Sequence, residues 1–308
     1  MDLKQLIKTS AEQLELAKLS YGHGTLNAHD EATWLVLWQL KLPLDLDLSE
    51  DLKHLQQQVL TLQAQLDVVQ ISSEHIQACQ ALIAQRIQTR KPAAYLTQEA
   101  WLQGIPFYID ERSIVPRSYI AELIADGGFD GWLSENSHMF LDLCTGNGSL
   151  AILSAMAYPD IKVIAADISL DALAVAKINV DQHQLADRIQ LVESDGLKNL
   201  TQKFDCIICN PPYVCEASMQ MLPEEFKAEP SLALAGGKDG MDFIQNMLID
   251  LPDHMTDKAI LVLEIGNERE HFEAAFPRLE AVWLDTSAGE DQVLLLTKEA
   301  LLKFKTHS

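Results

Sequence analysis

The sequence predicts an α/β protein in which a small helical domain precedes a doubly wound, mostly parallel sheet with an antiparallel edge strand. Three observations support this prediction. Apolar residues recur with a helical period up to about residue 92, and the period then changes. From residue 138 onward, strand, turn and helix patterns alternate. The last two strand patterns are joined by a short loop without a helix, so the final strand is expected to be antiparallel.

Residues 1–92 are expected to form a helical domain. Its first helix has one apolar stripe, formed by Leu3, Leu6, Ile7, Leu14 and Ala17. Asn27 and Ser49 are placed to cap helices over residues 28–41 and 50–69. Ser72 or Ser73 is expected to cap a fourth helix that continues to Arg90. Pro92 then ends it, because proline has no backbone N–H to donate.

Residues 93–117 are expected to form a hairpin-like connector, since apolar and polar residues alternate around Gly104. The domain over residues 118–308 contains the sheet. A helix is expected over residues 117–125, and residues 127–131 are expected to form a loop. Strands are expected over residues 140–143, 163–166, 189–192, 205–209, 260–264, 281–284 and 293–296. Helices are expected over residues 149–157, 170–182, 239–250 and 268–274.

The composition is that of a globular protein, with 48% hydrophobic and 22% charged residues in 308. These fractions argue against a disordered or collagen-like chain. No apolar run approaches the roughly 18 residues of a membrane-spanning helix, and the N-terminus lacks the apolar core of a secretion signal. A cytoplasmic protein that does not associate with membranes is therefore expected.

The chain is acidic, with 23 Lys and Arg against 45 Asp and Glu and a formal charge of −22. Residues 137–308 contain 13 basic and 27 acidic side chains, and 13 − 27 = −14. Such a field repels phosphate backbones and attracts basic partners. Autonomous DNA binding is therefore disfavoured, and a basic partner is expected to bind the C-terminal domain.

The five cysteines fit a reducing compartment. Cys206 and Cys209 form the only C-x-x-C pattern, but they lie in a predicted strand. Residues three apart on a strand point to opposite faces, so the two thiols cannot share one metal. We interpret them as buried structural cysteines.

A glycine-rich turn follows the first strand of the predicted sheet. It comprises Asp142 and the run Cys144, Thr145, Gly146, Asn147 and Gly148. Asp167 follows Gly148 by 19 residues, where an acidic side chain can bind ribose hydroxyls. This spacing predicts a nucleotide-type cofactor site. The alternative is that the glycines only permit a tight turn.

Two acidic residues favour an adenosyl cofactor without phosphate. A carboxylate at Asp142 would repel pyrophosphate, whereas it would attract the ammonium of an amino-acid tail. Asp195, followed by Gly196, comes directly after the third strand and is placed to accept a hydrogen bond from an adenine amino group. The alternative for Asp195 is a solvated turn aspartate.

The fourth strand leads directly into Asn210, Pro211, Pro212 and Tyr213. The prolines fix two φ angles, so the neighbouring carbonyls are held rigidly as acceptors. The Asn210 side chain has both a donor and an acceptor. A planar amide or aryl amino group can therefore donate its two hydrogens to the Asn210 oxygen and the Pro211 carbonyl, with Tyr213 covering the substrate. The arrangement predicts catalysis at a planar nitrogen.

These motifs resemble the Rossmann-like methyltransferases that use S-adenosylmethionine, and within them the HemK-type protein glutamine methyltransferases. Further segments that carry the resemblance are residues 93–96, 115–118, 229–237 and 263–266. The resemblance implies a seven-stranded methyltransferase sheet and direct methyl transfer to a glutamine side-chain nitrogen, with S-adenosylhomocysteine as product and without a metal. It implies that the helical domain over residues 1–92 recognises the substrate. It also implies that the glycine turn with Asp142, Asp167, Asp195, Gly196 and Asn210 binds the cofactor, and that Asn210 to Tyr213 act in catalysis.

The segment from Pro116 to Ile124 resembles the branch that acts on large-subunit ribosomal protein three, apart from Tyr119 where that branch has proline. The resemblance implies this basic protein as substrate, before or early in ribosome assembly. Three alternatives remain: methylation of a peptide-chain release factor, DNA adenine methylation, and a non-catalytic ribosome assembly factor.

Overall fold

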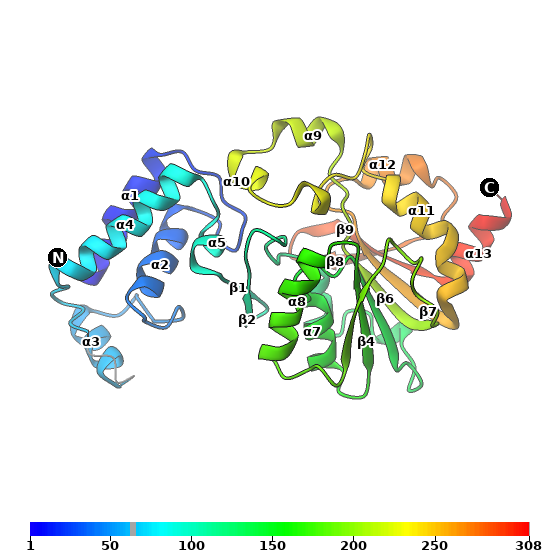
Figure 1. Cartoon of the computed structure of the whole chain (residues 1–308), viewed down its shortest axis with the longest axis horizontal. Coiled ribbons are helices and arrows are strands. Elements are labelled where there is room, and N and C mark those ends of the chain that lie inside the picture. Colours follow the sequence, from blue (N-terminus) through cyan, green and yellow to red (C-terminus); the bar gives the residue numbers. More distant parts are fainter. Residues whose placement is uncertain (62–65, 308) are drawn as a thin grey trace. The chain divides into compact units, whose positions relative to one another are not determined.

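The computed structural model describes residues 1–61 and 66–307, and the chain divides into two compact units (Figure 1). The helical unit comprises Met1–Glu99 together with Pro223–Ala228. The sheet unit comprises Ala100–Leu222 and Glu229–Ser308. A short segment from the C-terminal part of the sequence therefore packs as part of the helical unit.

The helical unit is built on apolar helix faces. Its helices are α1 (Leu3–Leu16), α2 (Ala28–Gln39), α3 (Leu52–Thr61), α4 (Ser73–Thr89), α5 (Ala93–Thr97) and α10 (Glu224–Lys227). The predicted stripe of α1 is buried at Leu3, Leu6, Ile7 and Leu14. Asn27 and Ser72 cap α2 and α4 by accepting hydrogen bonds from backbone N–H groups. The first two helices and the fourth are therefore confirmed.

The prediction of one helix over residues 50–69, capped by Ser49, is wrong. Helix α3 begins at Leu52, because Asp51 rather than Ser49 accepts the N–H groups of residues 53 and 54. Residues 62–65 lie outside the described part. Residues 66–69 are not helical, since the Gln56 side chain binds the Leu66 carbonyl and the Val68 N–H. A glutamine side chain thus replaces helical hydrogen bonds with contacts that fold the chain back.

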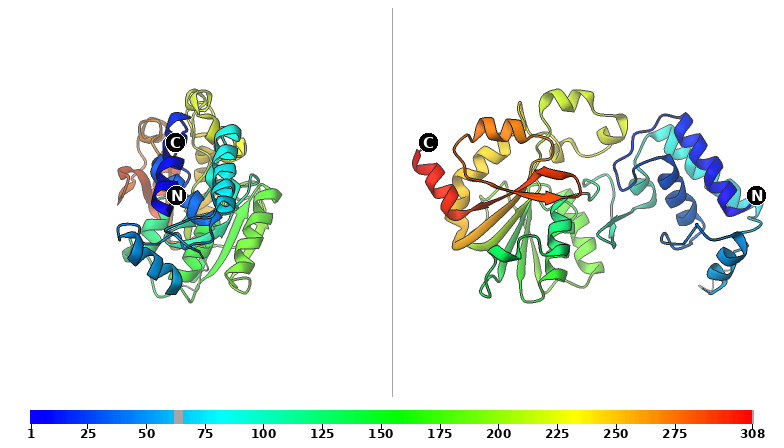
Figure 2. Two further views of the ribbon diagram at one scale, coloured as in Figure 1. Left: turned by 90° about the vertical axis from the view of Figure 1, so that its left-hand side faces the viewer. Right: turned by 180° about the vertical axis from the view of Figure 1, so that it is seen from behind.

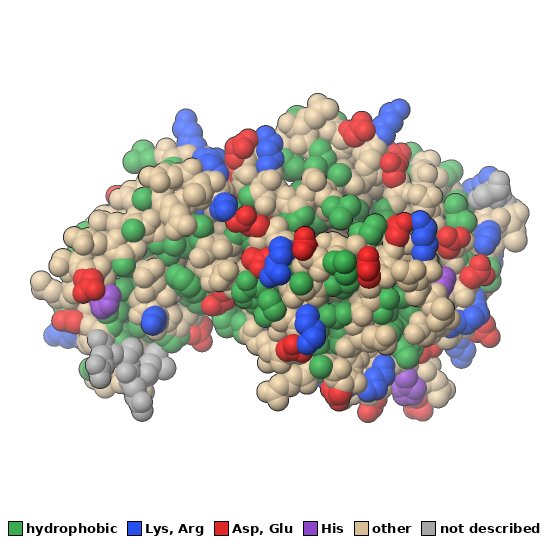
Figure 3. Space-filling view, in the orientation of Figure 1, with side chains coloured by type: hydrophobic (Ala, Val, Ile, Leu, Met, Phe, Trp, Pro, Cys, Tyr) green, Lys and Arg blue, Asp and Glu red, His purple; other side chains and the backbone are tan. Residues whose placement is uncertain are grey.

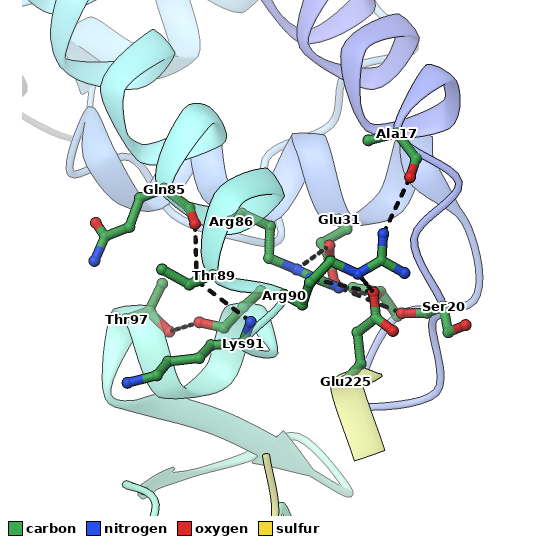
Figure 4. Close-up of polar contacts among 12 residues, drawn as sticks. Ala17, Ser20, Glu31, Gln85, Arg86, Thr89, Arg90, Lys91, Thr97 and Glu225 are labelled. Atoms are coloured by element: carbon green, nitrogen blue, oxygen red, sulfur yellow. Dashed lines mark hydrogen bonds and ion pairs between the residues drawn. The ribbon is translucent and has the colours of Figure 1, made fainter. Parts of the chain in front are cut away.

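A buried group of charges, the ion cluster, lies within the helical unit (Figure 4). It consists of Glu31, Arg86, Arg90 and Glu225. Arg86 Nε donates to Glu31 Oε1 at 2.8 Å. Glu225 Oε1 lies 3.7 Å from Arg86 Nη1 and 2.9 Å from Arg90 Nε. The Arg86 and Glu225 side chains are fully buried, so the segment containing α10 is held in this unit by paired charges.

The sheet unit contains a seven-stranded sheet in the order β5-β4-β3-β6-β7-β9-β8. Its strands are β3 (Met139–Leu143), β4 (Lys162–Asp167), β5 (Ile189–Glu193), β6 (Phe204–Cys209), β7 (Met255–Glu264), β8 (Val282–Thr286) and β9 (Gly289–Thr297). Strands β3 to β7 pair in parallel, and β9 is antiparallel to both β7 and β8. Figure 2 shows β8 and β9 together at the edge of this sheet. The seven predicted strands and the antiparallel pairing at this edge are confirmed, although β8 rather than the final strand β9 is outermost.

Helices cover both faces of this sheet. One apolar cluster packs β-strand residues against α6 (Ile120–Asp126), α7 (Ser149–Ala157) and α8 (Leu170–Gln182). The opposite cluster includes residues of α11 (Asp242–Asp250), α12 (Arg269–Ala275) and α13 (Lys298–His307). Successive strand residues alternate between the two clusters, as in a doubly wound sheet.

Several helix boundaries differ from the prediction. Helix α6 begins at Ile120 rather than residue 117, because Ser118 and the Tyr119 N–H bind the Glu264 carboxylate instead of continuing a helix. Helix α11 begins at Asp242 rather than residue 239, since the Asp239 side chain accepts the Met241 N–H. Residues 130–132 of the expected loop form a 3-10 turn. Helices α9 (Glu216–Met221), α10 and α13 were not predicted.

The connector contains a two-stranded sheet of β1 (Glu99–Leu102) and β2 (Ile105–Tyr108), joined through Gly104. Phe107 and Ile109 are buried, whereas Tyr108 and Asp110 are half-buried, so the predicted alternation is confirmed. The short helix α5 precedes these strands and was not expected. Its first residue follows Pro92, the N-cap position.

Cys206 and Cys209 are both buried, and they belong to the apolar clusters on opposite faces of the sheet. The interpretation of this pair as structural is consistent with that placement. Among residues 1–61 and 66–307, no helix is both long and apolar enough to cross a membrane. Acidic and basic side chains are interspersed over the sheet unit on the face shown in Figure 3.

Candidate functional site

The sheet register brings the predicted site residues to one edge of the sheet unit. Leu143, at the end of β3, pairs with Ala166 of β4 on one side and Cys209 of β6 on the other. The glycine turn, Asp167 and Asn210 therefore follow three adjacent parallel strands at their carboxyl ends. Open α/β sheets bind ligands at this edge.

Backbone conformation explains the two glycines of the turn. Gly146 and Gly148 have φ values of +57° and +82°, which side chains rarely tolerate. A Cβ atom on Gly148 would lie 3.2 Å from the Cβ of Ala176 in α8. Gly148 therefore also allows the start of α7 to pack closely against α8. Cys144, with φ of +63°, is a further left-handed residue in this turn.

Asp142 is buried beneath the turn, with 1% of its surface exposed. Its Oδ2 atom accepts hydrogen bonds from Thr145 Oγ1 at 2.5 Å and from the Ala151 N–H at 2.9 Å. Among the described residues, its Oδ1 atom has no hydrogen-bond partner. Burial raises the pKa of this carboxyl from 3.8 to about 7. One oxygen of a buried acid is thus left to accept a further donor.

Asp167 ends β4 and holds the glycine turn. Its Oδ2 accepts the Gly146 N–H and its Oδ1 accepts the Ser169 N–H, both at 2.9 Å. Burial raises the pKa of this carboxyl as well. Each oxygen retains a second lone pair for a ligand hydroxyl. Asp167 is therefore joined to the turn in a geometry that sequence spacing alone did not specify.

Asn147 supports the turn from within, because both ends of its amide are already bonded. Its Nδ2 donates to the Ile114 carbonyl and its Oδ1 accepts the Ser149 N–H. Asn179 of α8 donates to the Asn147 carbonyl and also binds both backbone groups of Tyr108. Sequence reasoning missed Asn179. A polar residue on the apolar face of a predicted helix is the signal that would have found it.

Asp195 and Gly196 follow β5, whose last residue, Glu193, pairs with Asp167. The Asp195 side chain is exposed and forms an ion pair with Lys198. Gly196 has φ of +58°, and its carbonyl accepts a hydrogen bond from Ser194. Both residues lie at the carboxyl edge of the sheet. The exposure of Asp195 is also what the alternative interpretation, a solvated aspartate in a turn, would predict.

The chain from Asn210 to Tyr213 leaves β6 at the same edge. Pro211 is buried, whereas Asn210 and Pro212 are half-buried. The Tyr213 hydroxyl donates to Glu264 Oε1 at 3.3 Å, and burial raises the pKa of this phenol. Tyr213 is thus held by the end of β7.

Three charged residues near this segment were not identified as site residues from the sequence. Glu264 binds Ser118, Tyr119 and Tyr213. Arg117 forms two hydrogen bonds with Glu229, at 2.5 and 2.7 Å. Glu264 ends an apolar run in the sequence, and this position is a signal that would have identified it as a site residue. A buried carboxylate needs hydrogen-bond partners.

The comparison with known families is consistent with this geometry. The family model called Methyltransferase small domain matches residues 132–239, a range that contains the glycine turn and Asn210. Among solved structures, the catalytic domain of hMettl16 in complex with the MAT2A 3'UTR hairpin 6 has a TM-score of 0.51. That match has 13% identity and covers 82% of this chain and 93% of the other, so it supports the fold.

Curated relatives match nearly the whole chain. A protein from Bordetella pertussis is 47% identical, with coverage of 97% of this chain and 96% of the relative. Relatives from Burkholderia pseudomallei and Neisseria meningitidis serogroup B are 45% and 42% identical, and each match covers at least 94% of both chains. All three are named ribosomal protein uL3 glutamine methyltransferase. Identity of this extent shows that the chain belongs to the ribosomal protein uL3 glutamine methyltransferase family.

Proposed function

We propose that this protein methylates the side-chain amide nitrogen of a glutamine in ribosomal protein uL3, with S-adenosylmethionine as methyl donor. The main support is the 47% identity to a relative of that name over 97% of the chain. The site residues add independent support, because the segment after β6 and the glycine turn lie at one sheet edge.

The glycine turn fits a cofactor with a cationic amino-acid tail. Asp142 Oδ1 is buried and unpaired among the described residues, so an incoming ammonium would satisfy it and favour its ionised form. Asp167 would bind the ribose hydroxyls with its remaining lone pairs. Gly146 and Gly148 leave the turn without side chains that would obstruct the cofactor. Asp195 would accept the adenine amino group after releasing Lys198.

Asn210 and Pro211 would orient the target amide. S-adenosylmethionine supplies an electrophilic methyl group when it is bound. An amide nitrogen is a weak nucleophile because its lone pair is delocalised. The Asn210 side-chain oxygen and the Pro211 carbonyl would accept its two hydrogens, in positions that favour the pyramidal nitrogen of the transition state. Pro212 keeps the chain rigid, and Tyr213 anchors its end.

The acidic sheet unit suits a basic substrate. Ribosomal proteins are generally basic because they pack against RNA, and the −14 charge on residues 137–308 would attract them. RNA covers much of that basic surface in a finished subunit. We therefore propose that the substrate is uL3 before or early in subunit assembly, in the cytoplasm, where ribosomal proteins are made.

Mass spectrometry of ribosomal proteins tests this function. Cells that lack the gene should lose the mass of one methylene group from one glutamine-containing peptide of uL3. Restoring the gene should return that mass, whereas restoring an Asn210→Ala copy should not. An unchanged uL3 together with loss of methylation on a release factor would contradict the proposed substrate.

A further inference from the structure

Four segments that are distant in the sequence meet around Tyr213, and the proposed chemistry uses only Tyr213 itself. They are the residues before α6, Tyr213 with its neighbours, the loop after α10, and the end of β7. Glu264 and Glu229 provide the charges at this meeting point. All of these residues belong to the sheet unit, so their contacts are internal to one compact body.

Glu264 is the last residue of β7 and is 3% exposed. Its preceding residue, Leu263, pairs with Cys209 in β6, so the register sets Glu264 level with Asn210. Its Oε2 atom accepts the Ser118 hydroxyl at 2.5 Å and the Tyr119 N–H at 2.9 Å. Three donors, including the Tyr213 hydroxyl, therefore converge on one buried carboxylate.

Three glycines approach the ring and backbone of Tyr213 closely, although Tyr213 itself is half-buried. A Cβ atom on Gly266 would lie 2.6 Å from the ring atom Cε2 of Tyr213. One on Gly240 would lie 2.2 Å from its carbonyl oxygen, and one on Gly236 would lie 2.7 Å from its Cα. Glycines from two segments thus allow the chain to enclose Tyr213 closely.

Backbone pairing extends this enclosure to the residues after Tyr213. The Val214 N–H donates to the Leu234 carbonyl at 2.8 Å, and the Gly236 N–H donates to the Val214 carbonyl at 2.9 Å. Glu229, near the start of this loop, binds Arg117 through both carboxylate oxygens and accepts the Val115 N–H. Arg117 directly precedes Ser118, which binds Glu264.

The pKa shifts of Tyr213 and Glu264 are compatible with a hydrogen bond in which the phenol donates to the carboxylate. Burial raises the pKa of Tyr213, which keeps the phenol protonated and able to donate at neutral pH. The hydrogen bonds from Ser118 and Tyr119 oppose the increase that burial causes in the pKa of Glu264. Removing one partner would leave a buried polar group unsatisfied, which is costly in a site of low dielectric.

We propose that Glu264 is a positioning residue for methyl transfer, which holds the Tyr213 hydroxyl and so fixes the segment that begins at Asn210. It acts through Tyr213 and has no contact with the substrate or the cofactor. This inference rests on the proposed function. It predicts that Glu264 affects turnover only while the Tyr213 hydroxyl is present.

A double-mutant cycle tests the prediction with purified full-length protein, free uL3 and labelled S-adenosylmethionine. Glu264→Gln and Tyr213→Phe should each lower kcat roughly 10-fold and leave the KM for the cofactor nearly unchanged. The double variant should lose no more than the larger single effect, because the Glu264 change acts on turnover through the Tyr213 hydroxyl. Independent, multiplying effects would overturn the positioning role.

Asp205 provides a matched control in the same sheet unit. It lies in β6 near the end opposite Asn210, and it also accepts three hydrogen bonds, from residues 138, 139 and 256. Asp205→Asn should leave the effect of Tyr213→Phe on kcat unchanged. A wild-type protein that methylates no form of uL3 would contradict the proposed function, whereas an active wild type with an additive cycle would contradict only the role of Glu264.

Hydrogen exchange provides a readout that does not require activity. Glu264→Gln should accelerate amide exchange at Val214 and Gly236, and Asp205→Asn should not. Unchanged protection at both amides would overturn the inference. Where Glu264→Gln does not fold, Ser118→Ala removes one donor from Glu264 Oε2, and its effect on kcat should likewise disappear in the Tyr213→Phe background.

Discussion

Two buried carboxylates of the sheet unit, Asp142 and Glu264, are bound differently from those of the helical unit, although Glu229 of the sheet unit is paired with Arg117. In the helical unit, Glu31 and Glu225 face the guanidinium groups of Arg86 and Arg90. In the sheet unit, the hydrogen bonds to Asp142 and Glu264 come from hydroxyl groups and backbone N–H groups. Arg86 lowers the pKa of Glu31, although burial raises it more. The hydrogen-bond partners of Asp142 are neutral, and its Oδ1 has none among the described residues, so a cationic ligand can add to them.

This difference assigns separate tasks to the two kinds of site. The ion cluster holds α10 within the helical unit, so its charges serve stability. Asp142 lies beneath the glycine turn and Glu264 lies beside Tyr213, so we expect them to affect binding and catalysis. Substitutions in the first group should therefore change unfolding, and those around the second should change function.

The largest expected effect is on stability, from Glu225→Ala. This change leaves a buried arginine charge without one of its partners and should cost about 3–5 kcal/mol of unfolding free energy. Urea denaturation followed by far-ultraviolet circular dichroism measures it. Glu224→Ala, at the exposed neighbouring position that pairs with Lys227, should change the unfolding free energy far less, because solvent screens an exposed ion pair. Equal losses of unfolding free energy in the two variants would contradict the distinction between the buried ion cluster and an exposed ion pair.

Asn210→Ala should produce the next largest effect, in turnover. Loss of one preorganised partner of the transition state lowers kcat roughly 100-fold to 1,000-fold, while most of the cofactor affinity should persist. Single-turnover methylation of uL3 and calorimetric titration of the cofactor separate the two quantities. Asn246→Ala, at an exposed position of α11, is the control. Normal turnover in the Asn210 variant would refute its assigned role.

Asp167→Ala should weaken S-adenosylmethionine binding by about 1.5–3 kcal/mol, because charge-assisted hydrogen bonds have that strength. The same substitution also removes the acceptor of the Gly146 N–H, so the glycine turn should exchange its amide hydrogens faster. Asp171→Ala, at an exposed position in the first turn of α8, should alter neither quantity. Unchanged calorimetric affinity in a folded Asp167 variant would exclude the ribose contact.

The pH dependence of cofactor binding should report on Asp142, whose pKa is about 7 in the ligand-free protein. The ionised form attracts the ammonium of the cofactor, so affinity should rise roughly tenfold between pH 6 and pH 8. Asp142→Asn should remove this slope. A slope of the same size in that variant would assign the titration to another group.

The contribution of Asp142 to folding stability changes with pH in the opposite direction to the cofactor affinity. The folded state raises the pKa of Asp142 from 3.8 to about 7, so it binds a proton more tightly than the unfolded state does. The stability that this carboxyl contributes is complete below pH 4 and is lost as the pH rises through 7. Saturating cofactor should reduce that loss, and thermal unfolding with and without cofactor measures the difference.

Local sequence patterns predicted the strands and the glycine turn, because periodicity and positive φ are properties of neighbouring residues. The edge at which Asp167 and Asn210 meet was also predictable, since parallel strands align their carboxyl ends. The contact between Arg86 and Glu225 was not, because it joins residues far apart in the chain. The early end of α3 depends on one glutamine side chain, Gln56, that binds distant backbone groups.

Glu264 shows the same limit within the site. The resemblance to a known family marked its segment, but only the folded chain reveals Ser118 and Tyr213 as its partners. Helix α13 was missed, although Leu301 and Phe304 pack in the apolar cluster on one face of the sheet. Predictions of structure from sequence thus succeeded where a feature depends on local conformation, and failed where it depends on pairing across the fold.

The most direct test is a side-by-side methylation assay with labelled S-adenosylmethionine and three acceptors: free uL3, mature large subunits and a peptide-chain release factor. Our account predicts that free uL3 is methylated fastest, at a single glutamine, and that mature subunits react more slowly because RNA covers the basic surface of uL3. Preferential methylation of the release factor would contradict the proposed substrate.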